Sequence, residues 1–180
     1  MSPRPAPDLS LRRDQLIDAA RELAEADGWP AVTMRRLAAE LGATQPVLYS
    51  AFAGRQELID AVALRGFDEI AAALGAVGSS PMARMRAYLG FAAARPRVYE
   101  AMFSLPTGFH FAAQDTPQQL RRAFSEIREA FPDADGTRAE VAWAALHGLA
   151  TLQAGGRLRP DQVQARLELT HRMLTGAAGR

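Results

Sequence analysis

The segment that decides the fold is Thr33–Phe52, with the sequence TMRRLAAELGATQPVLYSAF. It holds two short runs of helical spacing, separated by Gly42. Ala38 is small at the point where the two helices would cross, so their backbones can approach closely. The apolar residues whose spacing turns both helices toward a common core are Leu37, Leu41, Leu48 and Phe52. The pattern predicts two short crossed helices.

The turn and the two helix starts carry residues suited to those places. Gly42 falls where a sharp turn between helices needs a positive φ, which glycine adopts without a steric penalty. Thr33 and Thr44 are the expected N-caps of the two helices. Pro46 falls in the first turn of the second helix, where amide donors lack intrahelical partners in any case. This order of elements is that of a helix-turn-helix.

A helix-turn-helix binds DNA by laying its second helix in the major groove. Gln45 can pair with an adenine edge, and Pro46 or Val47 can touch a thymine methyl group. The alternative for Gln45 is a solvated helix residue. Phosphates are favoured at helix starts, and the Tyr49 hydroxyl and Arg55 can reach the same backbone. The predicted DNA contacts are Thr33, Arg35, Thr44, Gln45, Pro46, Val47, Tyr49, Ser50 and Arg55.

This segment resembles the N-terminal domain of the TetR family of regulators. The family pattern is a long first helix followed by Thr-x-x-x-Leu/Ile-Ala-x-x-x-Gly-Val-Ser-x-x-x-Leu-Tyr-x-His-Phe-x-x-Lys-x-x-Leu. Here Ala43 stands for the Val, Thr44 for the Ser, Ala51 for the His and Arg55 for the Lys. The resemblance implies a homodimeric, ligand-responsive repressor of a palindromic operator. The matching positions are Thr33, Leu37, Ala38, Gly42, Leu48, Tyr49, Phe52 and Leu58.

Almost every other long segment has helical periodicity, and none alternates as a strand does. We therefore expect an all-α chain of about nine helices. A helix-turn-helix DNA-binding domain is expected over 9–56, a bridging helix over 55–76, and an effector-binding and dimerisation domain over 79–176, after the turn at Gly78–Pro81. The expected helices span about 9–27, 34–41, 45–52, 55–76, 82–94, 96–105, 117–131, 137–154 and 160–174, with a loop over 106–116.

The C-terminal half resembles one branch of the family, marked by Trp143, His147 and Gly148. By analogy with the family, the last two long helices pair with those of a second subunit. The stripes suited to that pairing are Val141, Ala145, Leu149 and Leu152 on one helix, and Val163, Leu167, Thr170 and Leu174 on the other.

Aromatic and Met residues of the same half, Phe111 among them, are candidates for an apolar effector cavity, since such cavities are mainly apolar with few polar groups. For each residue the alternative is a place in the plain core. His147 is favoured as a structural histidine, whereas His110, between two phenylalanines in a loop, is a candidate for a cavity gate. The predicted ligand-binding residues are Tyr88, Phe91, Tyr99, Met102, Phe103, Phe109, His110, Phe124, Trp143 and His147.

The composition of the chain narrows the remaining classes of protein and of functional site. The 180 residues carry a net charge of +1, all the basic residues are arginine, and there is no cysteine. No apolar run reaches the roughly 18–20 residues of a membrane span, and the first residues lack a signal segment. We expect a cytoplasmic protein without metal, cofactor or catalytic residues. Arg12 and Arg13 are either a DNA-binding arm or a solvated charge pair.

Other functions on the same scaffold are a small-molecule carrier or enzyme, a helical adaptor that binds another protein, and a transcriptional activator. A carrier or an enzyme needs convergent polar or titratable groups in a cavity, which the sequence does not display.

Overall fold

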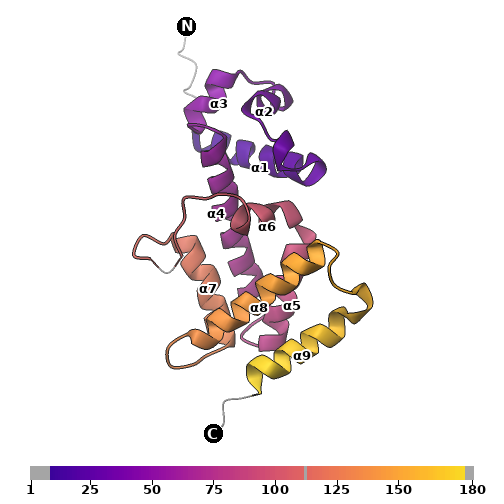
Figure 1. Ribbon diagram of the computed structural model, residues 1–180. Coiled ribbons are helices and arrows are strands. Elements are labelled where there is room, and N and C mark those ends of the chain that lie inside the picture. The colour runs from indigo at the N-terminus through magenta and orange to yellow at the C-terminus, as the bar shows by residue number, and fades with distance from the viewer. Residues whose placement is uncertain (1–8, 112, 177–180) are drawn as a thin grey trace. The chain divides into compact units, whose positions relative to one another are not determined.

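The computed structural model describes residues 9–111 and 113–176, and the side chains within them from Arg12 onward. This part of the chain consists of helices joined by loops and contains no strand, as expected (Figure 1). Its helices are α1 (Leu9–Asp27), α2 (Met34–Glu40), α3 (Gln45–Ala51), α4 (Arg55–Gly75), α5 (Pro81–Ala94), α6 (Pro96–Phe103), α7 (Gln118–Ala130), α8 (Thr137–Ala154) and α9 (Val163–Thr175), with 3-10 turns η1 (Trp29–Ala31) and η2 (Pro160–Gln162). No helix among these residues is long and apolar enough to span a bilayer.

The chain forms two compact units whose division does not follow the turn at Gly78–Pro81. The N-terminal unit comprises residues up to Leu64 together with Arg97–Gly108, and the C-terminal unit comprises Arg65–Pro96 and the chain from Phe109 onward. The division therefore falls within α4, which is one continuous helix. The sequence pattern alone grouped α6 with the C-terminal half.

Hydrogen bonds to α1 and η1 explain why α6 belongs to the N-terminal unit. One carboxylate oxygen of Glu25 accepts from the backbone amides of Arg97, at 3.1 Å, and Val98, at 3.2 Å. The indole Nε1 of Trp29 donates to the carbonyl of Arg97 at 2.8 Å. Farther along, the Gln56 amide donates to the carbonyl of Pro106 at 2.6 Å. Glu25 thus satisfies amides in the first turn of α6 that no helical carbonyl can reach.

The core of the N-terminal unit is built where α1 packs against α2 and α3. The expected cap at Thr33 forms, with its hydroxyl accepting from the amide of Arg36 at 3.2 Å. Thr44 occupies the N-cap position of α3, but its side chain makes no capping hydrogen bond. The side chains that fill this core, all nearly inaccessible, include Leu16, Leu37, Leu48, Phe52 and Leu58.

One predicted core residue is wrong: Leu41 is 39% exposed. The reason is that α2 ends at Glu40, so Leu41 is its C-cap and no longer shares the buried helical face. Gly42 follows with φ +57° and reverses the chain, as expected, and the amide of Ala43 then bonds to the carbonyl of Ala38 at 2.9 Å.

In the C-terminal unit, α5 packs against α8 and α9, and α7 packs against α8 (Figure 1). Arg84 is buried at the start of α5, where its guanidinium donates to the carbonyls of Gly78 and Glu126. It also pairs with the carboxylates of Glu126 at 3.0 Å and Glu129 at 2.8 Å. This buried cation is stabilised because it is paired with carboxylates and hydrogen-bonded as well.

The predicted stripe of α9 faces solvent only in part. Val163 is exposed, but Leu167, at the centre of the stripe, is buried in the unit's own core, because the apolar face of a helix first covers the core of its own subunit. Outside the stripe, Leu169 and Met173 of α9 are exposed. On α8, Val141 and Leu152 are exposed, so part of the predicted α8 stripe also faces solvent. Pairing of either helix with a second subunit stays a prediction.

Candidate nucleic-acid interface and apolar cavity

The predicted recognition helix α3 presents a polar face to solvent. Leu48 and Ala51 are buried, and Tyr49 is 49% exposed. Ser50 donates its hydroxyl hydrogen to the carbonyl of Val47 at 2.6 Å, so only its oxygen lone pairs remain for a base or phosphate. The exposed residues of this face are Gln45, Pro46, Tyr49 and Ser50, with Val47 half-buried beside them.

Arg13 ties the C-terminal end of α3 to the rest of the unit. Its guanidinium carbon lies 3.9 Å from the centroid of the Phe52 ring, and Nη1 donates to the carbonyl of Ala51. The same nitrogen lies 3.1 Å from Glu57 at the start of α4. The hydrogen bond from the Ala53 amide, and then the one from Arg13, lower the pKa of Glu57. Arg13 is therefore engaged within its own unit, although 41% of its side chain is exposed.

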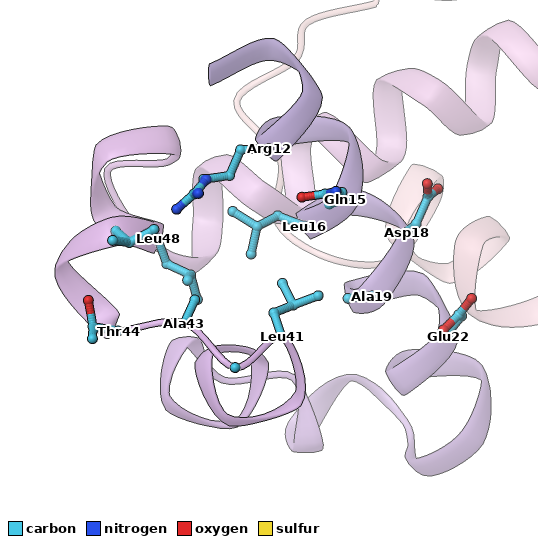
Figure 2. A pocket seen from close by; sticks show the side chains of 12 residues that line it. Arg12, Gln15, Leu16, Asp18, Ala19, Glu22, Leu41, Ala43, Thr44 and Leu48 are labelled. Carbon is cyan, nitrogen blue, oxygen red and sulfur yellow. The ribbon is translucent and has the colours of Figure 1, made fainter. Parts of the chain in front are cut away.

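Arg12 differs from its neighbour, because it makes no hydrogen bond or ion pair with any residue that the structure describes. It lines a groove of about 680 Å³ between α1 and the helix-turn-helix. Figure 2 shows Arg12 reaching from α1 toward Leu48, with Asp18 and Glu22 at the other end of the groove. The small side chain of Ala43 lines the side opposite α1.

Two adjacent arginines on α2 also have different surroundings. Arg36 pairs with Asp27 and Glu40, and these carboxylates, Asp27 first, raise its pKa. Arg35 is exposed and has no hydrogen-bonding or ionic partner in the described part of the chain. Arg35 is thus available to a phosphate, whereas Arg36 is engaged.

Arg55 holds the chain that leads into α2. Its Nε donates to the carbonyl of Val32 at 2.7 Å, and its Nη2 donates to the carbonyl of Trp29 at 2.8 Å. A guanidinium has five N–H donors, so these two bonds leave others for a phosphate. Contact of Arg55 with DNA stays a prediction, with a structural role beside it.

The C-terminal unit contains an apolar cavity of about 380 Å³. Two predicted ligand residues line it, Phe124 and Trp143. Phe111, one of the aromatic candidates for the cavity wall, lines it as well. The lining residues that sequence reasoning did not select are Ala113, Thr116, Leu120, Arg121 and Glu140, and none of these carries a signal that could have selected it.

The remaining predicted ligand residues lie elsewhere. Tyr99, Met102 and Phe103 belong to α6 and hence to the N-terminal unit, where Tyr99 and Phe103 pack at 4.8 Å between ring centroids. His147 is half-buried on α8, and burial lowers its pKa. The predicted residues of the C-terminal unit that do not line the cavity are Tyr88, Phe91, Phe109, His110 and His147.

Three aromatic rings form the wall of the cavity. The ring of Trp143 lies 5.4 Å from that of Phe111 and 5.8 Å from that of Phe124, centroid to centroid. Behind it, Trp143 Nε1 donates to the buried hydroxyl of Tyr88 at 3.2 Å. Thr116 is buried, and its hydroxyl bonds to the backbone of His110 and Ala113. No group of metal-ligating side chains gathers among the described residues.

Both halves of the chain match known protein families. Residues 16–62 match the family described as bacterial regulatory proteins, tetR family. Residues 82–176 match the family described as Tetracyclin repressor-like, C-terminal domain. The second match spans more than half of the chain.

Individual relatives agree with these matches. An uncharacterized HTH-type transcriptional regulator of Mycobacterium tuberculosis, Rv0681, is 28% identical over 98% of this chain and 83% of its own length. The HTH-type transcriptional repressor DrrR1 of Streptomyces coeruleorubidus is 43% identical over 31% of this chain and 20% of its own. The solved structure of the regulatory protein SCO4313 has a TM-score of 0.77 with 22% identity, covers 98% of this chain and all of its own, and shares the fold.

Proposed function

Since the chain belongs to the TetR family of bacterial regulatory proteins, and is therefore a DNA-binding transcriptional regulator, we propose that it represses transcription until a small molecule enters the apolar cavity of its C-terminal unit. The observation that carries this proposal is the exposed face of α3. Its polar residues face solvent although the same short helix anchors Leu48 and Ala51 in the core. Repression is favoured because a relative that is 43% identical over 31% of this chain is named as a repressor.

Contacts with DNA divide between base reading and positioning. Gln45, Pro46 and Val47 face the base edges, because they occupy the N-terminal turn of α3, the part of a recognition helix that enters the groove. The hydroxyl of Tyr49 and the guanidinium of Arg35 contact phosphates, which fix the register without reading sequence. Thr33, Thr44, Ser50 and Arg55 complete the proposed interface.

The protein acts as a homodimer through α8 and α9. Met173 is 72% exposed, and Leu169, Val141 and Leu152 add apolar surface on the same two helices. Apolar side chains clustered on the surface are typical of a protein interface. A two-fold dimer places two copies of α3 about one helical turn of DNA apart, roughly 34 Å, and so requires a palindromic operator.

We propose that the chain belongs to the branch of the family marked by a Trp-His-Gly pattern, because α8 carries Trp143, His147 and Gly148. A regulator that binds the chromosome works in the cytoplasm of a bacterium. Its relatives are regulators, and the cavity wall has no arrangement of nucleophile, base and oxyanion donors, so we assign no enzymatic activity.

Release from DNA is a shift between two states of the dimer. A ligand shifts that balance only by its difference in affinity for the two states. The chain crosses between the units at three places: within α4, at the Pro96–Arg97 junction, and where the chain leaves α6 and reaches Phe111 in the cavity wall. Glu25 and Trp29 fix α6 within the N-terminal unit, so a ligand that moves Phe111 pulls on a segment anchored near the helix-turn-helix.

The test is a gel shift of DNA from upstream of the protein's own gene, at low and then rising salt. We expect a retarded complex whose affinity falls steeply with salt, because phosphate contacts release counterions. A Gln45→Ala, Tyr49→Ala double variant, folded by circular dichroism, is expected to lose this complex. No retarded band with any upstream fragment at low salt would contradict the proposal.

A further inference from the structure

We infer that the cavity lined by α7, α8 and the loop residues Phe111, Ala113 and Thr116 takes a neutral, planar aromatic molecule that stacks on the indole ring of Trp143. This inference rests on the proposed function, since it names the class of effector that the regulator senses. Three observations support it. The polar groups in the cavity wall are hydrogen-bonded within the protein, three aromatic rings surround the space, and the charges at the rim balance.

The uncharged polar side chains of the wall are already satisfied within the protein. Trp143 turns its single donor to the hydroxyl of Tyr88, at 3.2 Å, and so has no N–H left for a ligand. Thr116 Oγ1 accepts from the Ala113 amide at 3.0 Å and lies 2.9 Å from the carbonyl of His110. If a ligand placed a polar group against this wall, that group would lose its hydrogen bonds to water and gain no hydrogen-bonding partner from the protein. Such a loss is unfavourable.

The aromatic rings favour a flat ligand. The planes of Phe111 and Phe124 are inclined at 48° and 59° to that of Trp143, so the three rings enclose an angular space rather than a parallel stack. A planar ligand can lie offset on one ring while its edges meet the faces of the others, which are the preferred aromatic geometries. The volume, about 380 Å³, lies at the small end of the range for ligand cavities and suits two or three rings.

The charges argue for a neutral ligand. The charged lining residues are one cation, Arg121, and one anion, Glu140, and both are exposed at the rim. An ionised group inside would leave water for a wall without a buried partner of opposite sign. Arg121 would attract an anion and Glu140 would repel it. For a cation the two effects are reversed, so the rim favours neither sign of charge.

A matched pair of probes tests the class of ligand on the full-length protein. N-phenyl-1-naphthylamine is a neutral molecule built of flat aromatic rings, and its 8-sulfonate differs by one anionic group. Binding is followed by the loss of indole emission, and the Trp143→Phe variant separates Trp143 from Trp29, the other tryptophan of the chain. We expect the neutral probe to quench Trp143 with an affinity about tenfold or more above that of the sulfonate, because the sulfonate would be buried unpaired.

Variants locate the binding. Phe111→Ala is expected to lower the affinity for the neutral probe by about fivefold or more, because it removes an aromatic ring from the cavity wall. Arg121→Ala and Glu140→Gln should change its affinity by less than about twofold, since exposed charges contribute little to binding a neutral molecule. The inference would be overturned if the sulfonate bound with equal or higher affinity. It would also be overturned if Arg121→Ala were the only one of these variants to lose binding of the neutral probe. Circular dichroism checks that each variant is folded.

The two proposals fail in different ways. If the protein shifts no DNA but the neutral probe quenches Trp143 selectively, the cavity inference stands and the repressor assignment fails. If DNA is shifted and the sulfonate is preferred, the assignment stands and the inference is overturned. Release of bound DNA by the neutral probe, diminished in Phe111→Ala, supports both.

Discussion

The guanidinium of Arg13 lies over the ring of Phe52, 3.9 Å from its centroid, and its Nη1 also bonds the last residue of α3. An arginine of α1 thus fixes the C-terminal end of α3, the proposed recognition helix. Replacing Arg13 with Gln removes a cation–π contact worth about 0.5–1 kcal/mol at an exposed site. We expect the thermal midpoint to fall by about 2–4 °C and DNA affinity to fall similarly for all sequences. Arg12→Gln, one residue away, should leave the midpoint unchanged in differential scanning calorimetry. Equal midpoints for both variants would refute the structural role of Arg13.

Arg35 and Arg36 offer a second matched pair. Arg36 is engaged by Asp27 and Glu40, whereas Arg35 is exposed without a partner in the described structure. Arg35→Ala should therefore reduce the slope of log affinity against log salt by about 1, as expected for a lost phosphate contact. Arg36→Ala should leave that slope nearly unchanged. Fluorescence anisotropy of labelled DNA over a salt series measures both, and a larger change for Arg36→Ala would reverse the assignment.

Gln45 and Tyr49 separate base reading from positioning. Tyr49→Phe removes the hydroxyl that we propose contacts a phosphate, and should weaken binding to good and poor operators by the same factor. Gln45→Ala should change the ranking of operators, because a bidentate contact to adenine is worth about 1–3 kcal/mol of discrimination. Competition binding against a set of single-base operator variants distinguishes the two effects. The opposite pattern would show that the roles are exchanged.

Ala43 lines the groove beside α1, at the position where the family pattern has Val. Ala43→Val adds two methyl groups to space that is already empty, and each buried methylene contributes up to about 0.8 kcal/mol. Because the groove is open to solvent, we expect a gain of about 1 kcal/mol in the free energy of unfolding, measured by urea titration. Ala53→Val, at an exposed position, is the control. Destabilisation by Ala43→Val would mean that the groove cannot accept the added volume.

His147 predicts how stability depends on pH. Burial lowers its pKa below the ordinary value of 6.5, so the imidazole stays neutral in the folded protein while the unfolded chain takes up a proton. The unfolded state is therefore favoured progressively as pH falls below about 6.5 toward the folded-state pKa. The His147→Gln variant should lose less stability than the unsubstituted protein when the pH is lowered from 8 to 5.5, as measured by thermal unfolding. Parallel pH profiles for the two proteins would contradict this.

Helices were predictable from the sequence because their ends are marked locally. The observed bounds of α1, Leu9–Asp27, and α8, Thr137–Ala154, coincide with the expected ones, since Gly28 and Gly155 follow them directly. Leu41 was misplaced because its exposure depends on which residue ends α2, and helix ends are the least certain part of such a prediction.

The cavity was harder to predict because its wall includes a loop. Phe111, Ala113 and Thr116 have no periodic pattern, and they meet Trp143 only through the packing of the whole unit. Conversely, Tyr99 and Met102 have the apolar character of a cavity wall but fill the N-terminal unit. Their location depends on Glu25, which binds the first turn of α6 from 72 positions earlier in the chain.

The contact of Glu25 and Trp29 with α6 has a consequence for biosynthesis. The N-terminal unit is discontinuous, because it needs Arg97–Gly108 as well as the chain up to Leu64. On the ribosome, the helix-turn-helix emerges long before the segment that completes its unit. Native closure of that unit must therefore wait until residue 108 has left the exit tunnel, and a chimera made by grafting only the first 64 residues would leave Trp29 uncovered.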